Sequence, residues 1–140
     1  RRIELQLSGT GSHPLSSGNG AAQYSVEHVF PKSPASGPNP DWQAELAQWK
    51  VSSIDQEKMC SLRHHIGNLT VVTNEANSKL GSKAFSVKKQ AFAGNHAVKI
   101  PPLGVNADIQ ASDRWTLKQI DERRKILTKA ILERWPLPSP

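Results

Sequence analysis

Two short stretches of the chain carry the hydrophobic pattern of β-strands. In residues 24–30, Tyr-Ser-Val-Glu-His-Val-Phe, apolar and polar side chains alternate. A period of two predicts a strand, which we expect to end near His28 because Pro31 follows it. A second strand is predicted over residues 68–73, since positions 70 to 73 are all β-branched. Residues 74–80 then have the character of a helical turn, with Asn74 as its cap.

Helical spacing is found in four further stretches, over residues 40–50, 55–62, 82–92 and 113–135. The first is amphipathic, with Trp42, Leu46 and Trp49 on one side. The start of this helix is predicted at Pro40, because Asn39 is a good N-cap and Pro suits the first helical position. The pattern over residues 55–62 is the weakest of the four.

The two later helices combine apolar faces with cations. In residues 82–92 the aromatic side chains are expected on one side, with Lys88 and Lys89 on the other. The last helix is predicted to begin at Ser112 or Asp113 and to turn its basic side chains, Arg123 among them, largely away from its apolar face. All four tryptophans lie at helical spacing, which favours core packing over base stacking. Cys60 is expected to be a small buried side chain, and residues 93–111 to form a loop containing Gly and Pro.

A chain of 140 residues is long enough for one domain with a modest core. We expect residues 1–22 to be an N-terminal segment and flexible loop, residues 23–92 to form the central unit with the helix 40–50 inserted, and residues 93–140 to supply a loop and a helix that packs on that unit. The first residue is not Met, so we expect a piece of a longer protein with further domains upstream.

The charge of the chain favours a polyanionic partner. Its formal net charge is +6, from 18 Lys and Arg against 12 Asp and Glu, and cations that neutralise phosphates release counterions. A merely basic, soluble surface accounts for the same charge equally well. A single cysteine excludes an internal disulfide and a multi-cysteine zinc cluster. The composition fits a cytoplasmic protein, because no apolar run approaches the ~18 residues of a membrane helix and no signal peptide is visible.

The residues around His28 suit the hydrolysis of a phosphodiester. Imidazole is the natural base near neutral pH, and the carboxylate of Glu27 is a hard oxygen ligand of the kind that Mg²⁺ or Mn²⁺ prefers. Adjacent strand residues point to opposite faces, so both can face one site only if the strand ends or twists there, which Pro31 favours. A helix after the second strand can supply another ligand, and Asn77 lies one turn into it.

The combination Glu27-His28-x-x-Pro31, then Asn68, then Asn77 resembles an HNH endonuclease with the ββα-metal fold. The flanking residues resemble more narrowly the C-terminal nuclease domain of GmrSD-type restriction proteins, which are bacterial defence enzymes that attack modified or foreign DNA. Sulfur-modification-linked phage-defence proteins carry a similar domain. The flanking matches are Ile66-Gly67-Asn68-Leu69-Thr70, Phe85, Lys88, Trp115, Ile120, Arg123 and Trp135-Pro136.

The resemblance implies an α+β fold in which two short antiparallel strands and a helix form the ββα-metal centre, wrapped by further helices. It implies that His28 is the general base and that Glu27 and Asn77 bind a single Mg²⁺ or Mn²⁺. It further implies that Asn68 holds the loop bearing His28, by hydrogen bonds from its side chain to backbone. The family more often has Asp at the position of Glu27. The longer side chain still offers a carboxylate, so the difference concerns the geometry around the metal and not the type of ligand.

The resemblance further implies a phosphate contact from Lys79 or Lys83. His64 and His65 precede the second strand and could line the metal site or hydrogen-bond DNA, and Lys88 and Lys89 are candidates for phosphate contacts. The simpler interpretation is that the lysines lie on solvated faces and that His64 and His65 are structural or surface histidines. The predicted function is metal-dependent nicking of DNA by the effector domain of a restriction or anti-phage protein, controlled by an upstream nucleotide-binding or sensor domain. The alternatives are a DNA-binding module that does not cleave, an RNase with the same site, and a structural zinc module using His28, His64, His65 and Glu27.

Overall fold

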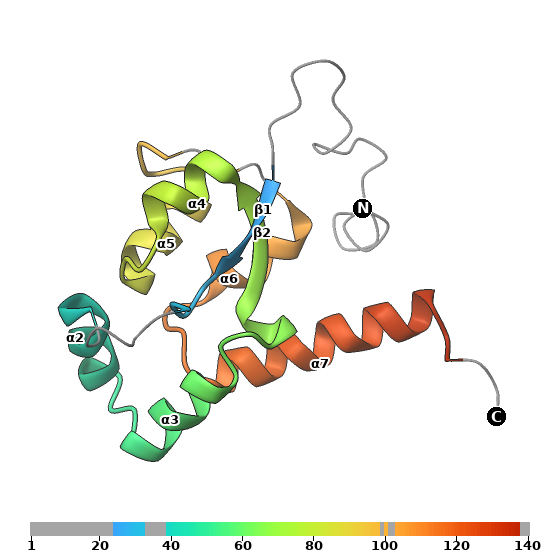
Figure 1. Ribbon diagram of the computed structural model, residues 1–140, viewed down its shortest axis with the longest axis horizontal. Helices are drawn as coiled ribbons and strands as arrows, with labels where there is room; N and C mark the ends of the chain where they lie inside the picture. Colours follow the sequence, from blue (N-terminus) through green and yellow to red (C-terminus); the bar gives the residue numbers. More distant parts are fainter. Residues whose placement is uncertain (1–23, 33–38, 99, 101–102, 138–140) are drawn as a thin grey trace.

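Two strands that lie far apart in the sequence pair at the centre of the molecule. The computed structural model describes residues 24–32, 39–98, 100 and 103–137, and the expectations for residues 1–22 lie outside them. The elements are β1 (Tyr24–His28), α2 (Pro40–Gln48), α3 (Ser53–Ser61), the 3-10 turn η1 (Ile66–Asn68), β2 (Leu69–Thr73), α4 (Asn74–Leu80), α5 (Phe85–Phe92), η2 (Gly104–Asn106), α6 (Ala107–Ala111) and α7 (Leu117–Arg134). The predicted α+β class is confirmed: among the described residues, two antiparallel strands are accompanied by six α-helices (Figure 1).

The register of the sheet decides which side chains are buried. Glu27 pairs with Thr70 and His28 with Leu69. Glu27 and Thr70 are each 3% exposed, whereas Val26 beside them is 54% exposed. One face of the two-stranded sheet is therefore covered, and Glu27 lies on that face.

Helix α4 follows β2 directly and packs back on both strands, which completes the ββα arrangement. The N-cap of α4 is not Asn74, as the sequence predicted. Thr73 is the N-cap, and its side chain accepts a hydrogen bond from the backbone N–H of Ala76, while Asn74 is already helical. The helix ends at Gly81, whose φ of 43° is accessible to glycine at little cost.

An aromatic series links the inserted helix α2 to the rest of the core. Phe30 packs edge-on against Trp42, Trp42 against Trp49 and Trp49 against Phe85, and Phe85 stacks on Trp115, with ring centroids 5.3, 6.2, 6.0 and 5.6 Å apart. Such pairs contribute about 0.5–1.5 kcal/mol beyond their buried area.

Core packing was also expected for Trp135, and there the expectation is wrong. Trp135 is 48% exposed because it follows the last turn of α7, and that end of the helix extends away from the other elements (Figure 1). Cys60 is only partly buried, at the edge of the core.

Polar contacts at helix ends also join α2 to α5. Asn39 caps α2 as predicted, by accepting a hydrogen bond from the backbone N–H of Asp41. The carboxylate of Glu45 accepts bonds from the backbone N–H groups of Phe85 and Ser86, at 2.8 and 2.9 Å. Glu45 thus satisfies the free N–H groups at the start of α5, and the negative charge suits that end of a helix.

The loop and helix boundaries after residue 93 were predicted incorrectly. Residues 104–111 form η2 and α6, and α7 begins at Leu117 with a capping box between Thr116 and Gln119. Helix α7 lies so close to η1 that a Cβ on Gly67 would be 2.0 Å from the carbonyl oxygen of Ile120. No helix among the described residues has the length and apolar character needed to cross a membrane.

Arg123 was expected on the outer side of α7, but it is 2% exposed. Its guanidinium donates to the carbonyl oxygens of Leu69 and Val105, both at 2.7 Å, and its Nε lies 2.8 Å from a carboxylate oxygen of Asp108. The guanidinium also donates to the carbonyl oxygen of Ile66 at 3.3 Å, so carbonyl groups of η1, β2 and η2 are bonded to this one side chain. Arg123 fixes η1 and the start of β2 on α7.

We predict that Arg123→Met lowers the free energy of unfolding by roughly 3 kcal/mol, since each buried carbonyl left without a donor costs about 1–3 kcal/mol. Urea denaturation measures this loss. Arg124→Met is the matched control, because Arg124 is half-buried and, among the described residues, forms its ion pair with Asp121 of its own helix. Equal stability of the two variants would contradict the role given to Arg123.

Candidate active site

The side-chain amide of Asn68 joins three parts of the chain. Asn68 is fully buried, and its Oδ1 accepts hydrogen bonds from the backbone N–H of Phe30 at 2.8 Å and the indole Nε1 of Trp115 at 3.1 Å. Its Nδ2 donates to the carbonyl oxygens of Phe30 at 2.9 Å and Arg63 at 2.8 Å. All four hydrogen-bonding positions of the amide are used. The sequence resemblance implied hydrogen bonds from this side chain to the loop bearing His28, and the backbone that the amide contacts here is that of Phe30, two residues after His28.

His28 ends β1, and its ring contacts a residue that the predicted site did not include. Its Nε2 lies 3.0 Å from Nδ1 of His64, and the two rings meet edge to face with centroids 5.1 Å apart. His64 lies two residues before the 3-10 turn η1 and directly follows Arg63, whose carbonyl oxygen accepts a hydrogen bond from Asn68. The sequence contained no periodic signal for this contact, since it depends on the fold of residues 62–68.

The surroundings of His28 keep its imidazole neutral more readily than in water. Burial lowers the pKa of His28 below its usual value, and electrostatic interactions with His64 and with the cations Lys32, Lys88 and Arg63 act in the same direction. A neutral imidazole has a free lone pair and can accept a proton.

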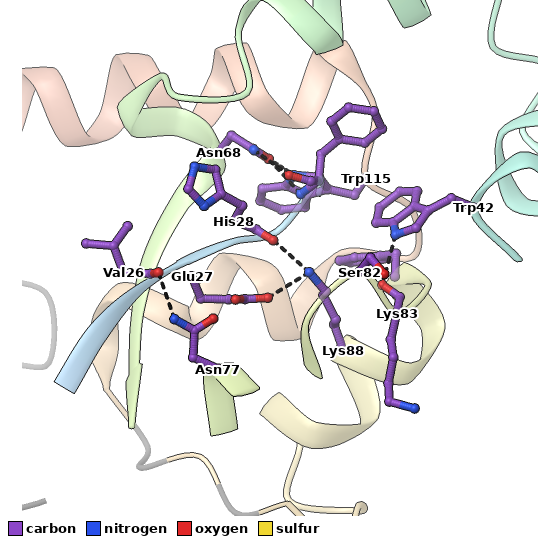
Figure 2. A network of polar contacts seen from close by, with 12 residues as sticks. Val26, Glu27, His28, Trp42, Asn68, Asn77, Ser82, Lys83, Lys88 and Trp115 are labelled. Atoms are coloured by element: carbon purple, nitrogen blue, oxygen red, sulfur yellow. Dashed lines mark hydrogen bonds and ion pairs between the residues drawn. The ribbon is translucent and has the colours of Figure 1, made fainter. Parts of the chain in front are cut away.

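Glu27 and Lys88 form an ion pair inside the protein. Lys88 is completely buried and its Nζ lies 2.7 Å from Oε1 of Glu27, and 2.7 Å from the carbonyl oxygen of His28 (Figure 2). Burial raises the pKa of Glu27 and lowers that of Lys88, and each charge opposes the shift of the other. The expectation that Lys88 lies on a solvated face and contacts DNA is wrong, because its ammonium is directed at the strand.

Asn77 lies beside Glu27 on the same side of β1. Its Nδ2 donates to Oγ of Ser25 at 2.8 Å and to the carbonyl oxygen of Val26 at 3.1 Å. These bonds orient the amide, so that its oxygen is turned toward the side of Glu27 (Figure 2). A cavity of about 370 Å³ is lined by Glu27, His28 and Asn77 together with Lys32.

The carboxylate and the imidazole leave β1 on opposite sides (Figure 2), as adjacent strand residues do. Both nevertheless contribute to the wall of this cavity at the end of the strand. A structural zinc centre does not fit this arrangement, because no three His, Cys, Asp or Glu side chains in the described part of the chain are placed to share a metal.

A hard divalent cation fits the cavity better. The carboxylate of Glu27 and the amide oxygen of Asn77 are the kind of oxygen donors that Mg²⁺ accepts while it keeps several waters. Lys88 donates to Oε1 of Glu27, and the backbone of His28 also bonds to this carboxylate, so an ion bound here would share the carboxylate with these donors.

The remaining predicted residues lie around this centre without joining it. Lys79 pairs with Glu75 at 2.6 Å on the surface of α4, and Lys89 pairs with Asp113 at 2.9 Å. The ammonium of the exposed Lys83 points away from His28 (Figure 2). Nδ1 of His65 is buried without a hydrogen-bond partner among the described residues, and the ring is not part of the cavity wall.

The sequence as a whole identifies the family of this domain. Residues 2–130 match the family described as GmrSD restriction endonucleases, C-terminal domain. The chain belongs to this family. Searches of curated proteins and of solved structures gave no match.

Membership of the GmrSD family gives the domain a nuclease function of the restriction-endonuclease type, with DNA as its substrate. The match includes the region of Glu27, His28, Asn68 and Asn77. The recognition made from the sequence is therefore confirmed at the level of the family.

We predict that Asn68→Ala lowers the free energy of unfolding by roughly 3 kcal/mol, because each buried partner left unpaired costs about 1–3 kcal/mol. Chemical denaturation followed by tryptophan fluorescence measures it. Asn95→Ala, at an exposed position, controls for the loss of an asparagine side chain. A stability of Asn68→Ala close to that of the control would show that the amide does not hold these segments.

Lys88→Met is expected to destabilise the domain by about 3–5 kcal/mol, because it leaves the carboxylate of Glu27 buried without a counter-charge. The double variant Glu27→Gln/Lys88→Met removes both charges and should lose less than Lys88→Met alone. Lys89→Met, next to it on α5, should stay close to wild type since its pair with Asp113 is exposed. Strictly additive losses in a double-mutant cycle would exclude a coupled pair.

Proposed function

We propose that this domain is an HNH-type, metal-dependent endonuclease that nicks DNA. The observation that carries the proposal is the cavity shared by Glu27, His28 and Asn77. The backbone on its His28 side is fixed by the buried amide of Asn68. Binding DNA without cleavage requires no imidazole beside two hard oxygen donors, so this geometry favours catalysis over a binding module.

His28 is the general base of the proposed reaction. Its lowered pKa keeps it neutral and able to take a proton from a water molecule. In-line displacement at phosphorus needs the attacking and leaving oxygens on opposite sides. Although the two side chains leave β1 on opposite sides, His28 and Glu27 both line the cavity at the end of the strand, so a phosphate bound there can meet the base on one side and the carboxylate on the other.

Glu27 and Asn77 are the proposed metal ligands. A divalent cation bound there supplies charge stabilisation at the phosphate and the leaving 3′-oxygen. Ser25 and the carbonyl of Val26 hold the Asn77 amide in place, and Lys88 holds the carboxylate of Glu27. Residues around the donors therefore fix their orientation before any ion binds, as is usual for metal ligands in proteins.

Several cations are placed to attract the DNA backbone toward this cavity. Lys32 is exposed in its wall and Arg63 lies near His28. Lys79, Lys83, Lys89 and His65 are further candidates. Lys79 and Lys89 can exchange their exposed carboxylate partners for phosphate groups. The net charge of +6 supports an electrostatic approach of the polyanion.

The biological setting that we propose follows from the family. The domain acts as the effector of a cytoplasmic restriction or anti-phage protein, and an upstream nucleotide-binding or sensor domain controls when it cuts. RNA remains the alternative substrate, because no described group in the cavity is arranged to read a 2′-hydroxyl.

We predict that the wild-type chain converts supercoiled plasmid to nicked circles with Mg²⁺ or Mn²⁺, and that EDTA abolishes the reaction. His28→Ala should reduce the nicking rate by about 10²–10⁴-fold, the usual contribution of a general base. His96→Ala is the matched control, since the hydrogen bond of the His96 ring within the described part of the chain is one accepted from the backbone N–H of nearby Val98. A wild-type chain that leaves DNA intact but cuts RNA would establish the RNase alternative.

Metal binding is tested separately by isothermal titration with Mn²⁺ in the absence of DNA. Asn77→Ala should weaken binding by at least about tenfold, and Asn95→Ala should not change it. Unchanged binding by Asn77→Ala would exclude Asn77 as a ligand, whatever the variant does to activity.

A further inference from the structure

We propose that His64 is a positioning residue that fixes the ring orientation and the tautomer of His28, an inference that rests on the nicking function proposed above. The contact is specific, with Nε2 of His28 3.0 Å from Nδ1 of His64 and the ring planes at 85°. A general base that is itself oriented by a third group is a recurring arrangement in hydrolytic enzymes.

The backbone around His64 is fixed by the same amide that fixes the backbone after His28. Nδ2 of Asn68 donates to the carbonyl oxygens of Phe30 and Arg63, at 2.9 and 2.8 Å. Phe30 lies two residues after His28, and Arg63 immediately precedes His64. One buried group therefore sets the distance between the two imidazoles.

Backbone hydrogen bonds restrain the segment further. The N–H of His65 donates to the carbonyl of Leu62, and the N–H of Asn68 donates to that of His65, both at 2.8 Å. His64 itself is exposed to solvent, so burial does not account for its position. Its contact with His28 is itself solvent-exposed.

The tautomers follow from the requirement that His28 accepts a proton. If Nε2 of His28 carries the hydrogen and donates it to Nδ1 of His64, then Nδ1 of His28 keeps a free lone pair. In the opposite arrangement His64 donates to Nε2 of His28, whose other nitrogen then carries its hydrogen, and no lone pair is left for water. Only the first arrangement leaves His28 competent as a base.

His64 also suits the charge that develops on His28. When water gives its proton to Nδ1 of His28, its oxygen bonds to phosphorus, the bond from phosphorus to the 3′-oxygen breaks, and the leaving oxygen takes a proton from solvent. The His28 cation keeps its Nε2–H bond to His64, which becomes charge-assisted and stronger. The other side chains whose charges act on His28, those of Lys32, Lys88 and Arg63, are cations and cannot accept this bond.

Kinetics distinguish a positioning role from a structural one. His64→Ala should lower the nicking rate at saturating DNA by about 10–100-fold and leave the KM for DNA and the melting temperature near wild type. His64→Asn should recover much of the rate, because its amide oxygen can accept the bond in place of Nδ1. His96→Ala should behave as wild type. Full activity of His64→Ala, or an Asn variant no better than Ala, would overturn the proposal.

A second readout does not depend on activity. In ¹⁵N NMR spectra of the full chain, a coupling across the hydrogen bond should join Nε2 of His28 to Nδ1 of His64, with the hydrogen on His28. The coupling should disappear in His64→Ala. If the chain nicks DNA but shows no such coupling, or carries the hydrogen on His64, then the positioning role of His64 is disproved and the proposed nuclease function is not. A wild-type chain that shows the coupling but cuts no nucleic acid disproves the proposed function and, with it, the catalytic use of the pair.

Discussion

The buried amide of Asn68 is the contact on which the rest of this site depends. Its oxygen and nitrogen together hold the backbone of Phe30, the carbonyl of Arg63 and the indole of Trp115. These groups come from the end of β1, the turn before η1 and the segment before α7. An amide can satisfy donors and acceptors simultaneously, which neither a carboxylate nor an apolar side chain can do. The same group thereby joins the aromatic core to the two histidines.

Charge burial is the second constraint on the architecture. Lys88 and Arg123 are both almost inaccessible to solvent, yet each has partners that offset the cost of losing water. Lys88 connects α5 to the carboxylate of Glu27, and Arg123 connects α7 to η1 and β2. The helices that wrap the ββα centre are thus attached to it by polar contacts as well as by packing. This mode of attachment places a carboxylate at the edge of the cavity with its orientation already set.

The sequence predicted what depends on local pattern. Both strands, α2 and α4 were located from alternation, β-branching and caps, because these signals act over a few residues. The burial of Lys88 and Arg123 was missed, since lysine and arginine are usually exposed and their partners are distant in sequence. Helix α6 was missed because it is short and follows a segment rich in Pro and Gly. His64 was a candidate for the metal site or for DNA, but its contact with the ring of His28 was not predicted, because only the fold of the turn held by Asn68 brings the two rings together.

The central claim is that the GmrSD-family cavity beside β1 is a single-metal nuclease site held in place by Asn68. Anomalous scattering from crystals of the full chain grown with Mn²⁺ tests it most directly. The account predicts one manganese peak within ~2.0–2.6 Å of oxygens of Glu27 and Asn77, on the opposite side of β1 from the ring of His28. A peak bound instead between His28 and His64, or no peak in the cavity at millimolar Mn²⁺, would contradict it.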